Sequence, residues 1–309
     1  MLLTMKDRIS FHDQIASNKR KSFFLLLGII AVFVILGYVI GLIAGEGYFF
    51  IIMILAIIIA IIYVWVGFYN SHKIALSSVK AKKASQSQYP DYHHSVEGLC
   101  LASGLPKPEL YVMEDSNINA FASGRNPKNA VICLTTGALE KLDKQELEGV
   151  LAHELSHVAN YDIRFMTLTA VLVGMIAIIS EIFLRTLFFS SISKGGGDRD
   201  GKAQIVILII GVILAILAPI VVMLVQLAIS RKREFTADAS AVKFIRSPTG
   251  LKNALKKIKN EHKPNSEQKH HYSKSVAPLF ISDPFKRNIK GLFQTHPSLE
   301  KRIEILEKM

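Results

Sequence analysis

His153, Glu154 and His157 form the pattern His-Glu-x-x-His within a stretch whose apolar flanks are typical of a helix interior. Residues four apart project from one face of an α-helix, a turn apart, so both imidazoles can reach a single Zn2+. Glu154 projects beside that face, where its carboxylate can accept a proton from a water molecule acidified by the metal. The spacing predicts a metal-dependent hydrolase. Because these are common residues that also meet on ordinary helices, the pattern needs support from its surroundings.

Four apolar runs dominate the remainder of this 309-residue chain, half of which is hydrophobic. They cover residues 23–43, 48–69, 165–189 and 205–229. At about 1.5 Å per residue, each run is long enough to cross a hydrocarbon core of about 30 Å. The first two predict a transmembrane hairpin, and the first is too long for a cleavable signal peptide. The last two predict a second hairpin, with long buried helices of a soluble core as the alternative.

Lysine and arginine predict the orientation of the chain. There are 37 Lys and Arg against 25 Asp and Glu, a net charge of +12. The basic residues gather before the first apolar run, after the second and after the fourth, whereas the first hairpin turn contains none. The positive-inside rule therefore places both termini and the polar segments in the cytosol. We expect no nucleic-acid partner, since no recognisable basic and aromatic module is present, and two cysteines exclude a disulfide scaffold.

The polar segments contain the strand and helix signals of a small α+β domain. Strands are predicted over residues 109–113, 119–122 and 130–135. Asp143 followed by Glu146 is a capping box that opens the helix containing the His-Glu-x-x-His pattern. Further helices are expected near the C-terminus, and residues 263–294 are interpreted as a flexible insertion or a lid. We therefore predict a mainly α membrane protein with four transmembrane helices and a cytosolic α+β domain with a small sheet. Its expected parts are a cytosolic N-terminal segment (1–22), a transmembrane hairpin (23–69), a first part of the cytosolic domain with the His-Glu-x-x-His helix (70–164), a second transmembrane hairpin (165–229) and a second part of the cytosolic domain (230–309).

A hydrolytic zinc site needs a third protein ligand and an open position. Glu234 is the first carboxylate after the fourth apolar run returns to the cytosolic surface, and Asp238 follows one turn later on the same helical face. We therefore predict that Glu234 is the third ligand. Asp238 is expected to accept a hydrogen bond from one of the two imidazoles. The alternative is a solvated, charged helix end next to basic residues.

The combination of motifs resembles the HtpX family of membrane zinc metalloproteases. It comprises residues 119–124, 146–162, 230–238 and 295–298 followed by Arg302. The resemblance implies a gluzincin-like fold and a zinc endopeptidase with one Zn2+ per chain, in which His153, His157 and Glu234 bind zinc. It also implies that Glu154 is the catalytic base.

Further roles are implied by the same resemblance. His296 and Arg302 would assist transition-state or substrate binding. The family's substrate edge strand would correspond to Asn119, Ala120, Phe121 and Ala122. Such a strand binds extended peptides through main-chain hydrogen bonds, which favours loose specificity.

The resemblance further implies a bacterial inner-membrane enzyme that degrades misfolded or damaged membrane proteins under stress, with its active site facing the cytosol. The expected partners are membrane-protein substrates and the lipid bilayer; homo-oligomer formation is left open. An intramembrane zinc protease is a weaker alternative, because the segment before His153 is too polar to lie in a span. A catalytically inactive zinc-binding scaffold or transporter is the other alternative. It is disfavoured because a structural site needs no base beside its ligands.

Overall fold

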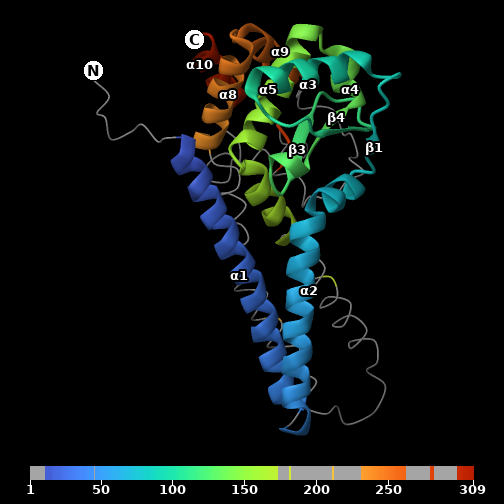
Figure 1. Ribbon diagram of the computed structural model, residues 1–309, viewed down its shortest axis with the longest axis vertical. Helices are drawn as coiled ribbons and strands as arrows, with labels where there is room; N and C mark the ends of the chain where they lie inside the picture. The colour runs from blue at the N-terminus through green and yellow to red at the C-terminus, as the bar shows by residue number, and fades with distance from the viewer. Residues whose placement is uncertain are drawn as a thin grey trace, which may run out of the picture.

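A long helical hairpin carries a globular domain at one end, as Figure 1 shows for the computed structural model. The structure describes residues 11–44, 46–172, 181, 211, 231–261, 279–281 and 298–309. The hairpin consists of α1 (Phe11–Ala44) and α2 (Glu46–Ser78), which pack side by side. The prediction of a mainly helical protein with a small sheet is confirmed.

Both hairpin helices extend beyond the apolar runs that predicted them. They contain 34 and 33 residues, so each is about 50 Å long, well above the thickness of a hydrocarbon core of about 30 Å. The extra turns of α1 precede Phe23, where we expected a separate N-terminal segment, and those of α2 follow Tyr69. These polar turns contact the globular domain, and they bring α1 within reach of the candidate site.

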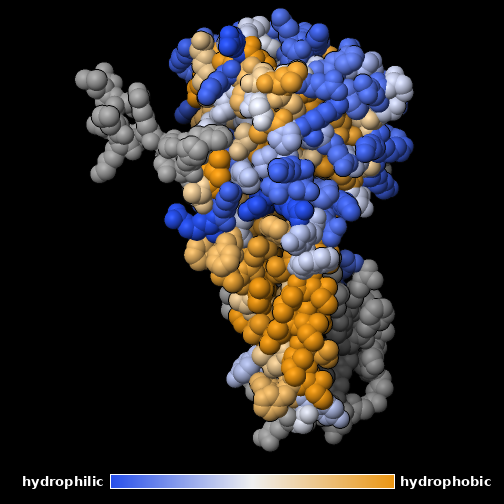
Figure 2. Space-filling model, in the orientation of Figure 1, coloured by the Kyte–Doolittle hydropathy of each residue, from blue (hydrophilic) through white to orange (hydrophobic). Residues whose placement is uncertain are grey.

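The lower part of the hairpin presents large apolar side chains to its surroundings, seen as a continuous hydrophobic surface in Figure 2. Within the described residues, one helix is long and apolar enough to cross a membrane, Gly47–Ser78, with a mean hydropathy of 3.2. Only 6% of its apolar window is buried, unlike the core helix of a soluble protein. The four predicted spans are therefore not established, and most of the third and fourth lies outside the described residues.

A four-stranded mixed sheet with the order β1-β2-β4-β3 forms the centre of the globular domain. Its strands are β1 (Lys82–Lys83), β2 (Glu109–Met113), β3 (Ala120–Gly124) and β4 (Ala130–Thr135). β2 runs parallel to β4, while β1 and β3 pair antiparallel with their neighbours. The predictions for β2 and β4 are confirmed to the residue, and β3 lies slightly later than predicted. β1 was not predicted, because two lysines carry no strand signal.

The two faces of the sheet pack against different layers. Leu110, Val112, Ile132 and Leu134 face a core shared with the helices of the domain. Alternate residues such as Cys133 face a second core, which includes side chains from both hairpin helices. Because side chains alternate along each strand, one face of the sheet packs against the helices of the domain and the other packs against the hairpin.

Six helices complete the described part of the domain: α3 (Pro90–Ser103), α4 (Thr136–Lys141), α5 (Lys144–Ala159), α8 (Arg231–Ile245), α9 (Thr249–Glu261) and α10 (Leu299–Leu306). The predicted capping box of α5 is confirmed, with Asp143 accepting from the Glu146 N–H and Glu146 accepting from the Asp143 N–H. A short turn follows α5, and another helical stretch begins at Asp162 and continues to the end of the described range at residue 172. α5 packs against both α8 and α9, which brings distant parts of the chain to one place.

Gly149 allows the backbones of α5 and α9 to approach closely. A Cβ at this position would collide with the backbone nitrogen of Leu251. We expect Gly149→Ala to lower the free energy of unfolding by about 1–3 kcal/mol, the usual cost of overpacking. The matched control is Gly98→Ala on the exposed side of α3, where the added Cβ meets no atom within 4 Å. Thermal unfolding in detergent measures both, and equal melting temperatures would contradict this account of the α5–α9 contact.

Candidate metal centre

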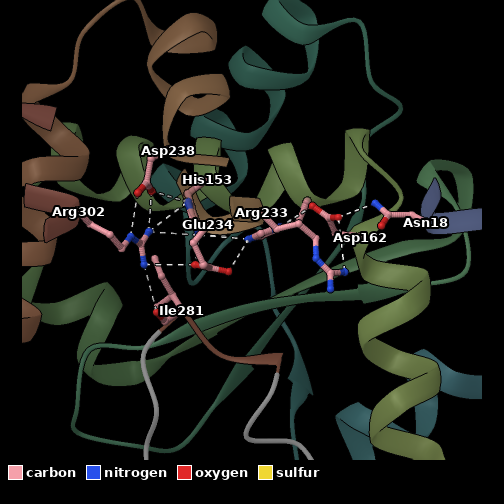
Figure 3. A network of polar contacts seen from close by, with 9 residues as sticks. Asn18, His153, Asp162, Arg233, Glu234, Asp238, Ile281 and Arg302 are labelled. Carbon is pink, nitrogen blue, oxygen red and sulfur yellow. Dashed lines mark hydrogen bonds and ion pairs between the residues drawn. The ribbon is translucent and has the colours of Figure 1, made fainter. Parts of the chain in front are cut away.

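The α5 and α8 helices bring two histidines and one glutamate together in the buried centre of the domain. His153 Nε2 lies 3.3 Å from His157 Nε2. Glu234 places one carboxylate oxygen 3.6 Å from His153 Nε2 and the other 3.6 Å from His157 Nε2. The three side chains form a group that could hold a metal ion, and the carboxylate comes from a segment far along the chain. Figure 3 shows His153 and Glu234 within the surrounding polar network.

The chemistry of this group fits a divalent metal. Tetrahedral zinc with ligands at about 2.0–2.1 Å has ligand atoms about 3.3–3.4 Å apart, close to the observed spacings. Among the described residues, buried Glu234 Oε2 accepts no hydrogen bond, and Arg302 approaches it only to 3.4 Å; leaving such an oxygen buried is costly unless another group compensates it. The carboxylates of Glu154, Glu234 and Asp238 interact with the buried guanidinium of Arg302. A divalent cation bound between the two imidazoles and Glu234 would add positive charge beside these buried carboxylates.

Asp238 contacts the Nδ1 side of the His153 ring, and Arg302 in turn binds Asp238. His153 Nδ1 lies 3.0 Å from Asp238 Oδ1, so Nε2 is left to face Glu234. Arg302 donates to both oxygens of Asp238, at 2.8 Å from Nε and 2.6 Å from its terminal nitrogen. Burial and Arg302 lower the pKa of His153, but the hydrogen bond to Asp238 and the nearby Glu234 carboxylate outweigh them and raise the pKa to about 9. A proton and a metal ion therefore compete for this imidazole.

His157 has a carboxylate partner of its own, Asp162, which the sequence did not reveal. Asp162 Oδ2 lies 3.0 Å from His157 Nδ1. We had expected a single such acceptor, Asp238, for one of the two imidazoles. The available signal was the position of this carboxylate directly after α5, five residues beyond His157.

Arg302 lies in the site, and its guanidinium is already bound to carboxylates of the protein. It is fully buried, it binds Asp238, and one terminal nitrogen lies 3.4 Å from Glu234 Oε2. The same nitrogen donates to the Ile281 carbonyl at 3.4 Å. His296, its expected companion, lies outside the described residues.

Glu154 is buried next to the two imidazoles. Glu154 is 2% exposed, and its carboxylate accepts a hydrogen bond from the Ala122 backbone on β3. Burial raises the pKa of Glu154, while the two histidines act in the opposite direction. A carboxyl group with a raised pKa can both accept and return a proton near neutral pH.

β3 is an edge strand of the sheet, as expected for residues 119–122, but its outer side is not open along its whole length. Phe121 forms an antiparallel β-bridge with Phe280, and the centroids of their rings lie 5.2 Å apart. The Ile281 N–H donates to the Ala120 carbonyl at 3.0 Å. A peptide can therefore pair with the Ala120 carbonyl only when residues 279–281 are displaced.

Two helix-borne histidines, a glutamate from a second helix and a further carboxylate beside them define the class of zinc metalloproteases. Comparison with known proteins places the chain within that class. Residues 86–309 match the family model "Peptidase family M48".

The similar proteins include two named "Protease HtpX homolog". The one from Thermoanaerobacter pseudethanolicus is 42% identical over 272 residues, covering 85% of this chain and 89% of the relative. The one from Listeria monocytogenes serotype 4a is 40% identical over 306 residues, covering 96% and 99%. A crystal structure of S. mikatae Ste24p aligns with a TM-score of 0.48 and 19% identity, over 95% of this chain and 66% of that one.

The chain therefore belongs to peptidase family M48, as one of its HtpX-type proteases. It is a membrane-associated metalloprotease that hydrolyses peptide bonds, and the inactive scaffold or transporter is not favoured.

Proposed function

We propose that the protein is a zinc-dependent endopeptidase that cleaves misfolded or damaged membrane proteins at the cytosolic surface of a bacterial inner membrane. His153, His157 and Glu234 hold one zinc ion per chain. The observation that carries this proposal is the convergence of the two imidazoles and the Glu234 carboxylate, with Glu234 Oε2 buried and accepting no hydrogen bond from the described residues.

Each residue of the centre has a chemical task in peptide hydrolysis. Bound zinc supplies Lewis acidity, which makes a water molecule easier to deprotonate and a carbonyl easier to attack. Glu154 accepts the proton of the attacking water and returns it to the leaving nitrogen; its burial and raised pKa support that role. Asp238 fixes the orientation of His153 through the Nδ1 contact.

Arg302 acts mainly by holding the acidic side of the centre in place. Its guanidinium is bound to Asp238 and lies beside Glu234, which supports a positioning role over direct contact with the reacting carbonyl. The transition-state role proposed for His296 stays a prediction.

The substrate binds as an added strand along β3, from Asn119 to Ala122, after residues 279–281 have moved away from Ala120 and Phe121. Main-chain pairing of this kind accepts many sequences, which suits removal of damaged proteins. The contact between the Ala122 backbone and Glu154 supports this placement, since it joins the edge strand directly to the catalytic base.

The membrane lies around the apolar part of the hairpin, with the protease domain on the cytosolic side. Support comes from aromatic and basic side chains at the junction, where Arg125 lies 4.4 Å from the Tyr69 ring and Arg164 lies 5.5 Å from the Phe68 ring. We propose that two further spans, within residues 165–229, separate the two parts of the protease domain, 70–164 and 230–309.

Peptidase activity with an unfolded membrane protein in detergent tests this function. We expect cleavage by the zinc-loaded protein, loss of cleavage after treatment with a chelator, and recovery when zinc is returned. Fragment masses identify internal cleavage sites and so distinguish an endopeptidase from an exopeptidase. Stoichiometric zinc binding without any cleavage of unfolded substrates would contradict the proposed function and favour the scaffold.

A further inference from the structure

Asn18 is a buried polar residue on the N-terminal helix α1, and it contacts the turn that follows the metal-binding helix. Asn18 is 2% exposed. Asn18 Nδ2 donates to Asp162 Oδ1 at 2.6 Å and to the Asn160 carbonyl at 3.0 Å. These contacts join segments more than 140 positions apart, and Figure 3 shows Asn18 pointing at Asp162.

Asp162 connects Asn18 to the metal centre. While one of its oxygens accepts from Asn18, the other lies 3.0 Å from His157 Nδ1. His157 Nε2 is thereby directed at Glu234 and His153. A carboxylate that accepts the second N–H of a ligating histidine fixes both the tautomer and the ring orientation. Asn18 is therefore joined to the candidate metal ligand His157 by two successive hydrogen bonds.

The described surroundings of Asp162 give Asn18 a specific task. Asp162 is fully buried, and its nearest cation, Arg233, approaches Oδ1 no closer than 3.9 Å. The guanidinium nitrogens of Arg233 make no hydrogen bond, and the group stacks on Phe165 at 5.1 Å. Without Asn18, Asp162 Oδ1 would lose its 2.6 Å donor, and the carboxylate could turn away from His157 towards Arg233.

The backbone between the two helical stretches is shaped for this contact. Tyr161 adopts a left-handed conformation with φ of 58°, which is uncommon for a bulky residue. The turn presents the Asn160 carbonyl and the Asp162 carboxylate to the same amide of Asn18. Lys19, the next residue of α1, lies 4.5 Å from the Tyr161 ring and holds the same turn. Such strain persists where the surrounding contacts fix it, and two residues of α1 provide those contacts.

We propose that Asn18 is a positioning residue, through which α1 orients Asp162 and hence the zinc ligand His157. The proposal rests on the proposed zinc site. Under this proposal, metal binding depends on the packing of α1 against the protease domain. Displacement of α1 would therefore lower the affinity of the site for zinc.

Zinc affinity of the full chain in detergent tests the proposal, measured by competition with a chromophoric chelator. Asn18→Leu keeps the approximate volume of the side chain and removes the donor, and Asn18→Ala also removes the volume. We expect both variants to bind zinc roughly 10-fold more weakly, at the lower end of the effect of losing the direct partner of a ligating histidine, because Asn18 acts through Asp162. The visible spectrum of the Co2+-substituted protein should shift in both. The matched control is Ser22→Ala, one turn along α1, whose buried hydroxyl donates to the Asn18 carbonyl within the helix.

A double-mutant cycle with Asp162→Asn separates positioning from a general loss of structure. If Asn18 acts through Asp162, adding Asn18→Leu to Asp162→Asn should cause little further loss of zinc affinity. Unchanged affinity in Asn18→Leu, or losses that simply add in the double variant, would overturn the proposal. Failure of the wild-type protein to bind zinc would instead refute the proposed function, so the two failures are distinguishable.

Discussion

Replacing Glu154 by glutamine is expected to abolish peptide hydrolysis while leaving zinc bound. The variant keeps the size of the side chain and loses the basic carboxylate beside the two imidazoles. General-base catalysis contributes about 10²- to 10⁴-fold, so kcat/KM should fall by at least about 100-fold. Because Glu154 is not among the three metal-binding side chains, zinc content should stay near one per chain. Peptidase assays and metal analysis on the same preparation measure both quantities.

Glu148→Gln is the matched control for this experiment. Glu148 lies on the same helix, is partly exposed, precedes His153 by five residues and is not among the three side chains that could hold a metal. Its variant should retain the activity and the zinc content of the parent protein. Near-normal hydrolysis by Glu154→Gln would refute the role of Glu154 as base, and loss of zinc from that variant would place its carboxylate among the ligands.

Replacing Glu234 by glutamine is expected to have the opposite signature, with metal loss as the primary defect. The amide is a weaker, neutral ligand, and its NH2 group would face the imidazole nitrogens that lie 3.6 Å from the carboxylate oxygens. We expect zinc affinity to fall by more than about 100-fold, beyond the effect of losing a partner that only orients a ligand.

Added zinc distinguishes the two variants. Part of the activity of Glu234→Gln should return at high free zinc, whereas Glu154→Gln should stay inactive at every zinc concentration. Normal zinc retention in Glu234→Gln would show that another group supplies the third ligand. Dialysis against a graded series of zinc buffers provides the measurement.

Local patterns predicted most of the elements that form the centre. The capping box at Asp143 predicted the start of α5, and β-rich composition predicted β2 and β4 with their observed bounds. Spacing alone put His153 and His157 on one face. The structure brings Glu234 and Asp238 to that face, where membrane topology had led us to expect them.

Contacts between distant segments were the part that the sequence could not reveal. Asn18 carries no periodic or capping signal that would connect it to Asp162, since a single amide–carboxylate bond across 144 positions leaves no local pattern. The pairing of Ile281 with Ala120 was hidden for the same reason, within a polar segment interpreted as a flexible insertion. The extended polar ends of the hairpin helices were missed because hydropathy reports the bilayer thickness and not the length of a helix.

X-ray absorption at the zinc edge of the purified full chain, combined with metal analysis, examines the site most directly. We predict one zinc per chain with nitrogen and oxygen neighbours at about 2.0–2.2 Å, an imidazole signal from two histidines, and loss of ordered binding in Glu234→Gln. A sulfur neighbour at about 2.3 Å, or a protein that binds no stoichiometric metal, would contradict the assignment of His153, His157 and Glu234.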